Sequence, residues 1–411
     1  MTESRASPNR RRRCRKHMAD EQPPRLSRRA RDIQPFQVMN ILARARAMEA
    51  ASRSIVHMEI GEPDFPTPRP IVEAGIRALQ EGHTHYTPAL GLAALRETIS
   101  AFYRERYAVD VAPARIAITP GASGALQLVL SLLVNPGDQV LLTDPGYPCN
   151  RHMVRLAGGE AVVLNVSAET NYQPTAAQVT AAWSPQAAAV MLASPANPTG
   201  TLISPAVLKD ILAVAAARRG CLIMDEIYHG LVYEDKPAAT ALALSDQVFV
   251  VNSFSKYFGM TGWRLGWLVV PEQYTPHVDK LAQNLFLAAS TPAQYAALAA
   301  FRPETIAILE DRRREFAQRR DYLLAALRGL GFAVPVTPGG AFYVYADCRR
   351  FSADSFGFAA DILERAGVAV TPGNDFGHNH PEHYLRFAYT TSLDMLEEGV
   401  RRLGEFLRNH H

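Results

Sequence analysis

One segment of the chain, residues 248–270, reads VFVVNSFSKYFGMTGWRLGWLVV. The apolar runs at 248–251 and 265–270 show little alternation, which is typical of strands buried on both faces of a sheet. Between them lies Lys256, flanked by hydroxyl residues and followed by glycines and Arg264. An amine crowded by a second cation has a depressed pKa and is nucleophilic near neutral pH. The segment therefore predicts two buried strands and a turn that presents a reactive lysine.

Short apolar runs of the same kind recur upstream. They occupy residues 116–119, 140–143, 161–165, 188–193 and 221–224. Helical patterns separate many of them, as at 124–134 and 205–219, and further helices are predicted from Ile33 and at 69–81 and 92–107. Alternating strands and helices predict an α/β fold with a large, doubly wound, mostly parallel sheet.

The alternation stops after Pro271, and the predicted organisation changes there. Helical stretches run to about residue 330, and strands follow at 339–345 and 384–389. We predict a smaller α+β domain, built from N- and C-terminal segments. The four parts are a disordered basic tail at 1–31, an N-terminal segment of the small domain at 32–60, a large domain at 61–300 and the small C-terminal domain at 301–411.

The charge is distributed unevenly along the chain. Residues 1–31 hold eleven Lys or Arg and three acids, a balance of +8, which leaves −5 for the other 380 residues. A mildly acidic body favours neither nucleic-acid binding nor a membrane surface. The two long uncharged windows, 116–137 and 281–301, are interrupted by proline and polar residues, so we predict no membrane span. Four widely spaced cysteines are typical of a reducing compartment, which predicts a cytoplasmic protein.

In an open α/β sheet, ligands bind beyond the carboxyl ends of the strands. The first such turn follows the strand at 116–119 and contains Gly121, Ala122 and Ser123 before a helix. Small residues at a helix N-terminus leave amide groups free to hold an anion. The turn therefore predicts a phosphate site, although glycine-rich turns of this kind also occur without one.

Three further turns carry side chains typical of a ligand site. They contain Tyr147, then Asn197, and then Asp225, Glu226 and Tyr228. Two carboxylates at the end of an apolar strand are costly to bury unless a cation accompanies them. A metal ion is one such cation, but only His229 lies nearby with ligand spacing, so we expect no metal site. Tyr147 and Asn197 also have simpler interpretations, as a packed ring and a turn-initiating residue.

Together these turns resemble the motifs of class I/II aminotransferases, enzymes of the pyridoxal-phosphate fold type I. The segment Ser253-x-Ser255-Lys256, followed by Gly262-x-Arg264, is similar to the family's lysine motif. The other matching motifs are Gly61, Tyr86-Thr87-Pro88-x-x-Gly91, Asn197-Pro198-x-Gly200, Asp225-Glu226-x-Tyr228 and Tyr384-Leu385-Arg386-Phe387. The resemblance runs from about residue 33 to the C-terminus.

The resemblance implies that pyridoxal 5′-phosphate is the cofactor. Lys256 would bond to its C4′ atom and carry a proton between C4′ and the substrate Cα, and Asp225 would lie against the pyridine nitrogen. The other residues that it implies are Tyr147 on the ring face, Asn197 and Tyr228 at the 3′ oxygen, and Gly121, Ala122, Ser123, Ser253, Ser255 and Arg264 around the phosphate.

The resemblance also implies the reaction, an amino exchange between an L-amino acid and a 2-oxo acid by a ping-pong route. Arg386 would clamp the substrate α-carboxylate, with Asn197 and Gly61 beside it. Tyr86 would reach the phosphate of a neighbouring subunit, which implies a homodimer. No second arginine for a side-chain carboxylate can be identified, and Ser123 stands where some relatives for acidic substrates carry lysine. We therefore predict neutral substrates, with residues 339–343 as one wall of the side-chain pocket.

Two other functions share parts of this pattern. A C–S β-lyase or a cyclopropane-carboxylate synthase on the same fold would also use Lys256 and Arg386. A transcriptional regulator with an aminotransferase-like domain would need a folded DNA-binding domain, and the 31 unpatterned residues at the start have too little apolar content for one.

Overall fold

The computed structural model describes residues 25–234 and 238–409. By its contacts the chain divides into one unit that ends at Gln34 and a second that begins at Pro35. The described part of the first unit contains α1 (Arg28–Asp32), a five-residue helix capped by the Ser27 side chain. The predicted disordered tail thus includes one helical turn at its end, while residues 1–24 lie outside the described residues.

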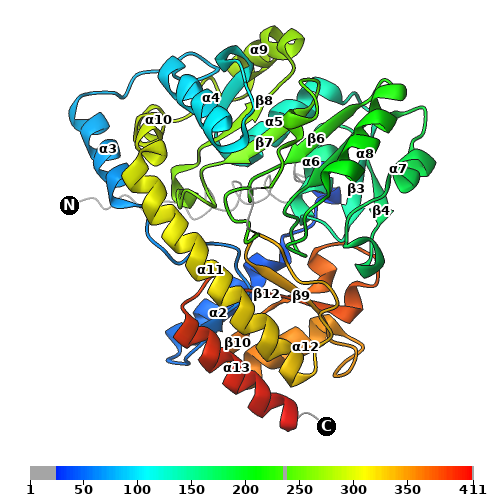
Figure 1. Ribbon diagram of the computed structural model, residues 1–411. Helices are drawn as coiled ribbons and strands as arrows, with labels where there is room; N and C mark the ends of the chain where they lie inside the picture. Colours follow the sequence, from blue (N-terminus) through cyan, green and yellow to red (C-terminus); the bar gives the residue numbers. More distant parts are fainter. Residues whose placement is uncertain (1–24, 235–237, 410–411) are drawn as a thin grey trace, which may run out of the picture. The chain divides into compact units, whose positions relative to one another are not determined.

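A seven-stranded sheet forms the centre of the second unit (Figure 1). Its order is β2 (Ile116–Thr119), β8 (Gly266–Val269), β7 (Phe249–Ser253), β6 (Cys221–Asp225), β5 (Ala187–Ala193), β3 (Gln139–Asp144) and β4 (Glu160–Asn165). Only β8 runs antiparallel to its neighbours. The predicted large, mostly parallel sheet is confirmed, and the bounds of each strand predicted for it lie within two residues of the observed ones.

Alternate residues of the central strands are buried in two different cores. Val190 and Leu192 of β5 belong to one apolar cluster, and Ala189 and Met191 belong to the other. This is the burial that unbroken apolar runs predict, since successive side chains of a strand point to opposite faces. The helices that pack on the sheet are α4 (Ala93–Tyr107), α5 (Gly121–Leu133), α6 (Pro148–Leu156), α7 (Ala176–Ala182) and α8 (Pro205–Ala217). Outside them, α9 (Thr275–Leu285) packs on α5, α10 (Thr291–Leu298) packs on α4, and α3 (Arg69–Gln80) packs on α10.

The smaller sheets join the two ends of the second unit. β1 (Val56–His57) pairs in parallel with β10 (Val368–Ala369), and β12 (Tyr384–Ala388) lies between β11 (Thr371–Pro372) and β9 (Tyr343–Asp347). The long helix α11 (Pro303–Leu330) runs from the helices of the large sheet to these strands (Figure 1), and α12 (Ser355–Asp361) and α13 (Leu393–Arg408) follow it. An α+β part built from both ends is thus confirmed, and its boundaries at residues 60 and 300 stay a prediction.

The helix predicted from Ile33 begins later, as α2 (Gln37–Ala50). Pro35 disfavours helical backbone at the residue before it, so the helix cannot continue back through this point. Its first amides are capped from far along the chain, because the Asp375 carboxylate accepts hydrogen bonds from Gln37 N at 3.0 Å and Val38 N at 3.2 Å. Asp375 is only 3% exposed, so this link belongs to the core of the unit.

We expect Asp375→Ala to lower the free energy of unfolding by about 1–2 kcal/mol, because two buried amides lose their acceptor. Chemical denaturation followed by circular dichroism measures this loss. Asp375→Asn keeps one acceptor oxygen and is expected to lose less than the alanine variant. Equal stability of the alanine variant and the unmodified protein would contradict the proposed cap.

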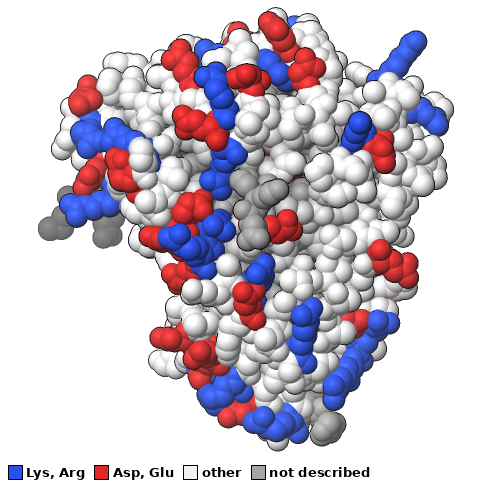
Figure 2. Space-filling model, viewed as in Figure 1, with Lys and Arg blue, Asp and Glu red and all other residues white. Residues whose placement is uncertain are grey.

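Charged side chains of both signs are interspersed on the face shown in Figure 2. This agrees with a body whose net charge is small. Across residues 25–234 and 238–409, no helix combines the length and apolar character that a bilayer crossing requires.

Candidate active site

A cavity of about 370 Å³ lies at the carboxyl ends of β5, β6 and β7. Its volume falls in the range of pockets for small organic ligands. The predicted site residues that line it are Gly61, Ala122, Ser123, Tyr147, Asn197, Asp225, Tyr228, Ser253, Ser255, Lys256, Arg264 and Arg386. The structure therefore gathers residues that are as far apart in sequence as Gly61 and Arg386.

Two predicted site residues, Gly121 and Tyr86, are not among those that line the cavity. Gly121 lies beside the cavity, under Arg264, and its φ of +70° favours glycine. A β-carbon at Gly121 would lie 2.7 Å from Arg264 Nη2, so the arginine packs where a side chain would otherwise be. Tyr86 is 82% exposed and does not line the cavity of its own chain. Its predicted contact with a neighbouring subunit stays a prediction.

Lys256 follows β7 and extends its amine into the cavity. Its Nζ donates a hydrogen bond of 2.7 Å to the carbonyl oxygen of Gly61. Burial is the main cause that lowers the pKa of Lys256 to about 8; the charges of Arg386 and Arg264 act in the same direction, and those of Glu62 and Asp225 oppose them. The predicted depressed pKa thus has burial as its main cause, with the neighbouring cations second. At one pH unit below this pKa about a tenth of the amine is neutral, and hence nucleophilic, a far larger share than for an exposed lysine.

The carboxylates of Asp225, the last residue of β6, and of Glu226, the next residue, have different surroundings. Asp225 is 5% exposed and faces the cavity, and its Oδ1 accepts a hydrogen bond from Ile227 N at 3.1 Å. Burial raises the pKa of Asp225 to about 6, against the opposing effects of that amide and of Lys256. Glu226 points away from the cavity and accepts hydrogen bonds from Thr240 Oγ1 and Ala241 N. Only Asp225 can therefore serve a ligand, and a cation beside it would favour its charged form.

Arg386 is held in place by the protein alone. Its Nη1 donates to Asn197 Oδ1 at 3.0 Å, and its Nη2 donates to the carbonyl oxygen of Glu59 and to Thr371 Oγ1. The guanidinium also lies 4.2 Å from the centre of the Tyr343 ring. Arg386 is 2% exposed, and its Nε has no hydrogen-bond partner within the described chain. An oriented, buried guanidinium with an unused donor is suited to bind a carboxylate.

Tyr343 lies at the site. From the sequence it was predicted only as part of the wall at 339–343, with no role of its own. Its hydroxyl lies 2.9 Å from that of Tyr228. A β-carbon at Gly61 would overlap the same hydroxyl, which explains the glycine there. Of the predicted wall, only Tyr343 is among the residues found to line the cavity.

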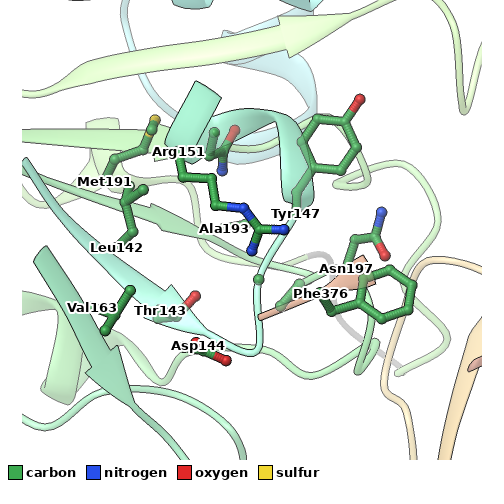
Figure 3. Close-up of a pocket in the computed structure, with 13 residues that line it drawn as sticks. Leu142, Thr143, Asp144, Tyr147, Arg151, Val163, Met191, Ala193, Asn197 and Phe376 are labelled. Carbon is green, nitrogen blue, oxygen red and sulfur yellow. The ribbon is translucent and has the colours of Figure 1, made fainter. Parts of the chain in front are cut away.

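Other residues at the cavity were also missed. Phe36, Val38 and Met39 come from the start of α2 and form an apolar part of its lining. A second, smaller cavity of about 30 Å³ shares Tyr147 and Asn197 with the first. Figure 3 shows the Arg151 side chain extending from α6 beside Tyr147 in that smaller cavity. Its Nη2 donates to the Asp375 carbonyl at 3.2 Å. Helical i, i+4 spacing from Tyr147 is the signal that could have indicated it.

One end of the large cavity is suited to an anion. α5 begins there without a side-chain cap, so its first amides are free to act as donors. Ser253 and Ser255 are buried beside it, and Arg264 completes the group. The set of groups fits pyridoxal phosphate: an amine for its aldehyde, a carboxylate for its ring nitrogen, and hydroxyls, amides and a guanidinium for its phosphate. The close packing of Arg264 over Gly121 is a second observation in favour of this fit.

Comparison with known proteins shows the family. The model for "Aminotransferase class I and II" matches residues 53–403. The chain is 38% identical over 385 residues to a (5-formylfuran-3-yl)methyl phosphate transaminase of Methanocaldococcus jannaschii, covering 93% of this chain and 99% of that protein. It is 38% identical over 376 residues to a valine–pyruvate aminotransferase of Mycobacterium tuberculosis, covering 91% and 97%.

A solved structure extends the likeness to the whole fold. The crystal structure of an aminotransferase from Mycobacterium tuberculosis superposes with a TM-score of 0.90 at 37% identity, over 94% of this chain and all of that one. The reactive lysine, the buried carboxylate and the oriented arginine thus lie on a backbone shared with transaminases. The chain belongs to the class I and II aminotransferase family and is a pyridoxal-phosphate-dependent aminotransferase.

Proposed function

We propose that this aminotransferase exchanges the amino group between a neutral, apolar L-amino acid and a 2-oxo acid. The observation that carries the proposal is the charge of the cavity wall. Among the described residues that line the cavity, three are cations: Lys256, Arg264 and Arg386. Each has a place at the cofactor or at the α-carboxylate, so none is left for a second carboxylate. Glu62, which also lines the cavity, would repel one.

The rest of the wall supports an apolar side chain. The larger apolar side chains that line the cavity include Phe36, Val38, Met39, Ile60, Leu126, Ile227 and Tyr343. Phe36 packs edge to face on Tyr147, with ring centroids 6.1 Å apart. Burial of a valine-sized or larger side chain against such a wall is favourable by about 1.5–3 kcal/mol. The name of the M. tuberculosis relative, a valine–pyruvate aminotransferase, supports the same substrate class.

The cofactor, when bound, supplies an aldehyde carbon that takes up the amino group and a ring that accepts the electron pair left at the substrate Cα. We assign the attachment and the proton transfer at Cα to Lys256 Nζ. Asp225 would keep the pyridine nitrogen protonated. Tyr147 would cover the ring, and Asn197 and Tyr228 would donate hydrogen bonds at its 3′ oxygen.

The phosphate of the cofactor and the carboxylate of the substrate would bind to different groups of residues in the cavity. The phosphate would be held by the amides that begin α5 and by Ser253, Ser255 and Arg264. The substrate carboxylate would be held by Arg386, with the Gly61 backbone and Asn197 beside it. Fixing both groups orients the Cα–H bond relative to the ring, which is catalysis by positioning.

A panel of amino donors tests the proposed substrate class. The enzyme is mixed with each amino acid in a single turnover, and conversion of the cofactor to its amino form is followed by absorbance. We expect apolar donors such as valine, leucine and alanine to react with higher kcat/KM than aspartate. A preference for aspartate would contradict the substrate class. Conversion by no amino acid, with release of a thiol from a cysteine conjugate, would instead favour the C–S β-lyase alternative.

Replacing Arg386 by lysine is expected to raise KM and lower kcat for every amino acid. An ammonium lacks the planar fork that holds a carboxylate with two parallel hydrogen bonds, so both binding and orientation suffer. Steady-state kinetics measures both constants. Arg350→Lys, a change of another arginine outside the cavity lining, is the matched control and should leave them unchanged. An unaltered KM in Arg386→Lys would refute the carboxylate clamp.

We also propose a cytoplasmic homodimer. Ile76 and Leu79 on α3 are at least half exposed, and Tyr86 nearby is 82% exposed, so this apolar region is suited to be covered by a second copy. Cys149, Cys221 and Cys348 are free thiols, which supports a reducing compartment. Sedimentation velocity is expected to give twice the chain mass of 45.1 kDa, and a monomer would contradict the dimer.

A further inference from the structure

Outside the active site, one short turn brings together three side chains that can bind a metal ion. The segment 378–384 reads HNHPEHY. His380, Glu382 and His383 each direct a ligand atom to within 4.8 Å of the other two. None of the three lines the active-site cavity. No metal site is predicted from the sequence, and this turn is not among the predicted site residues.

The distances within the cluster match a tetrahedral site. His380 Nδ1 lies 3.5 Å from Glu382 Oε1, and His383 Nε2 lies 3.4 Å from the same oxygen. Zinc binds imidazole nitrogen and carboxylate oxygen at about 2.0–2.2 Å, so two ligands of a tetrahedron are about 3.3–3.6 Å apart. Two of the three edges therefore have the required length already. The two imidazole rings lie parallel, with centroids 5.2 Å apart, so a modest rotation of exposed side chains closes the third edge.

The backbone that carries these ligands is fixed by the fold. A short 3₁₀ helix, η9 (Pro381–His383), closes with a hydrogen bond from His383 N to His380 O. The Ser355 hydroxyl donates to Pro381 O at 2.9 Å, and Cys348 N donates to His383 O at 2.8 Å. The ligands are thus attached to a held turn and need only side-chain adjustment to bind. Preorganisation of this kind lowers the entropic cost of binding.

We propose that His380, Glu382 and His383 form a binding site for a divalent transition metal of the zinc class. Two imidazoles and one carboxylate are a ligand set that zinc uses, with water as the fourth ligand. Mixed nitrogen and oxygen donors disfavour magnesium and calcium, which prefer oxygen alone.

The position of the site suggests a structural role. The turn leads directly into β12, which carries Arg386, and the preceding His378 N and Asn379 N donate to the Asp144 carboxylate at the end of β3. A bound ion would fix the exposed side of this connection. A ligand that binds only the folded state raises its stability, so the metal should raise the thermal unfolding midpoint.

Zinc titration of the chelator-treated holoenzyme by isothermal calorimetry tests the proposal. We expect one zinc ion per chain, and at least a tenfold weaker affinity in each of His380→Gln, Glu382→Gln and His383→Gln. The unfolding midpoint should rise with zinc in the unmodified enzyme and should not rise in His383→Gln. Circular dichroism confirms that each variant is folded.

Two controls separate this site from other imidazoles of the chain. His277→Gln changes an exposed histidine of α9, and a variant with both His410→Gln and His411→Gln removes the terminal pair. Both should bind zinc as the unmodified enzyme does. Absence of zinc binding, unchanged binding in the three ligand variants, or loss of binding in either control would overturn the proposal. None of these outcomes bears on the transamination assay, so the proposed function is tested separately.

Discussion

Replacing Lys256 with alanine is expected to abolish turnover and to remove the visible absorbance that the attached cofactor gives the protein. In the proposed mechanism the amine would be both the nucleophile for the cofactor aldehyde and the base at the substrate Cα, so one substitution would remove two functions. General acid–base catalysis alone contributes about 10²- to 10⁴-fold to a rate, and loss of attachment adds to it. We therefore expect kcat/KM to fall by about 10⁴-fold or more.

The measurement pairs an absorbance spectrum with an amino-transfer assay. Lys209→Ala changes an exposed lysine on α8 and is the matched control, with spectrum and activity expected unchanged. Added methylamine restores a primary amine at the alanine variant and should recover part of the rate. Full activity in Lys256→Ala would remove the basis of the mechanism proposed for this cavity.

The second largest effect is expected for Asp225→Ala. The buried carboxylate, 5% exposed, is the anion that would hold a proton on the ring nitrogen and so allow the ring to accept electrons. Without it, the removal of the Cα proton should slow by about 10²- to 10⁴-fold, and cofactor binding should weaken. Because burial raises the pKa of Asp225 to about 6, the carboxylate without cofactor is ionised above that pH and gains a proton below it.

Deuterium at the substrate Cα distinguishes this effect from simple loss of cofactor. At saturating cofactor, the variant should show a larger isotope effect than the unmodified enzyme, because proton removal becomes rate-limiting. Equilibrium dialysis gives the cofactor affinity separately. Asp210→Ala, an exposed acid on α8, serves as control. An isotope effect and a rate equal to those of the unmodified enzyme would exclude the assigned role.

The large sheet could be predicted from the sequence because its strands carry strong local signals. β2 was located to the residue, and β6 differs only by including Asp225. Apart from the terminal Thr119 and Asp225, both strands are apolar, since both faces of the sheet are covered. β1, β10 and β11 were missed, because two residues are too few for any period to be visible. The start of α2 was placed before Pro35, although a proline disfavours helical backbone at the preceding residue. The cap that Asp375 provides could not be predicted, because no local pattern indicates it.

The candidate site also contains residues that the sequence could predict and residues that it could not. Residues at or just beyond the ends of strands, such as Lys256, Asp225 and Asn197, could be identified from the sequence. They are polar or charged side chains that end apolar runs. Phe36 and Arg151 were missed because their place at the cavities depends on packing between distant segments. The main cause of the lowered pKa of Lys256 was also hidden, since burial is a property of the folded chain and not of a motif.

The contact between Asp375 and the start of α2 has a consequence for the order of assembly. Its partners are separated by 338 residues, and closing so long a loop is entropically costly until other contacts have shortened it. During synthesis the cap on the first turn of α2 can form only after Asp375 has emerged. We therefore expect the apolar part of the cavity lining formed by Phe36, Val38 and Met39 to be completed late. The large sheet and the turn that carries Lys256 should form before it. We expect the cofactor to be able to enter the nascent enzyme before this part of the cavity lining is in place.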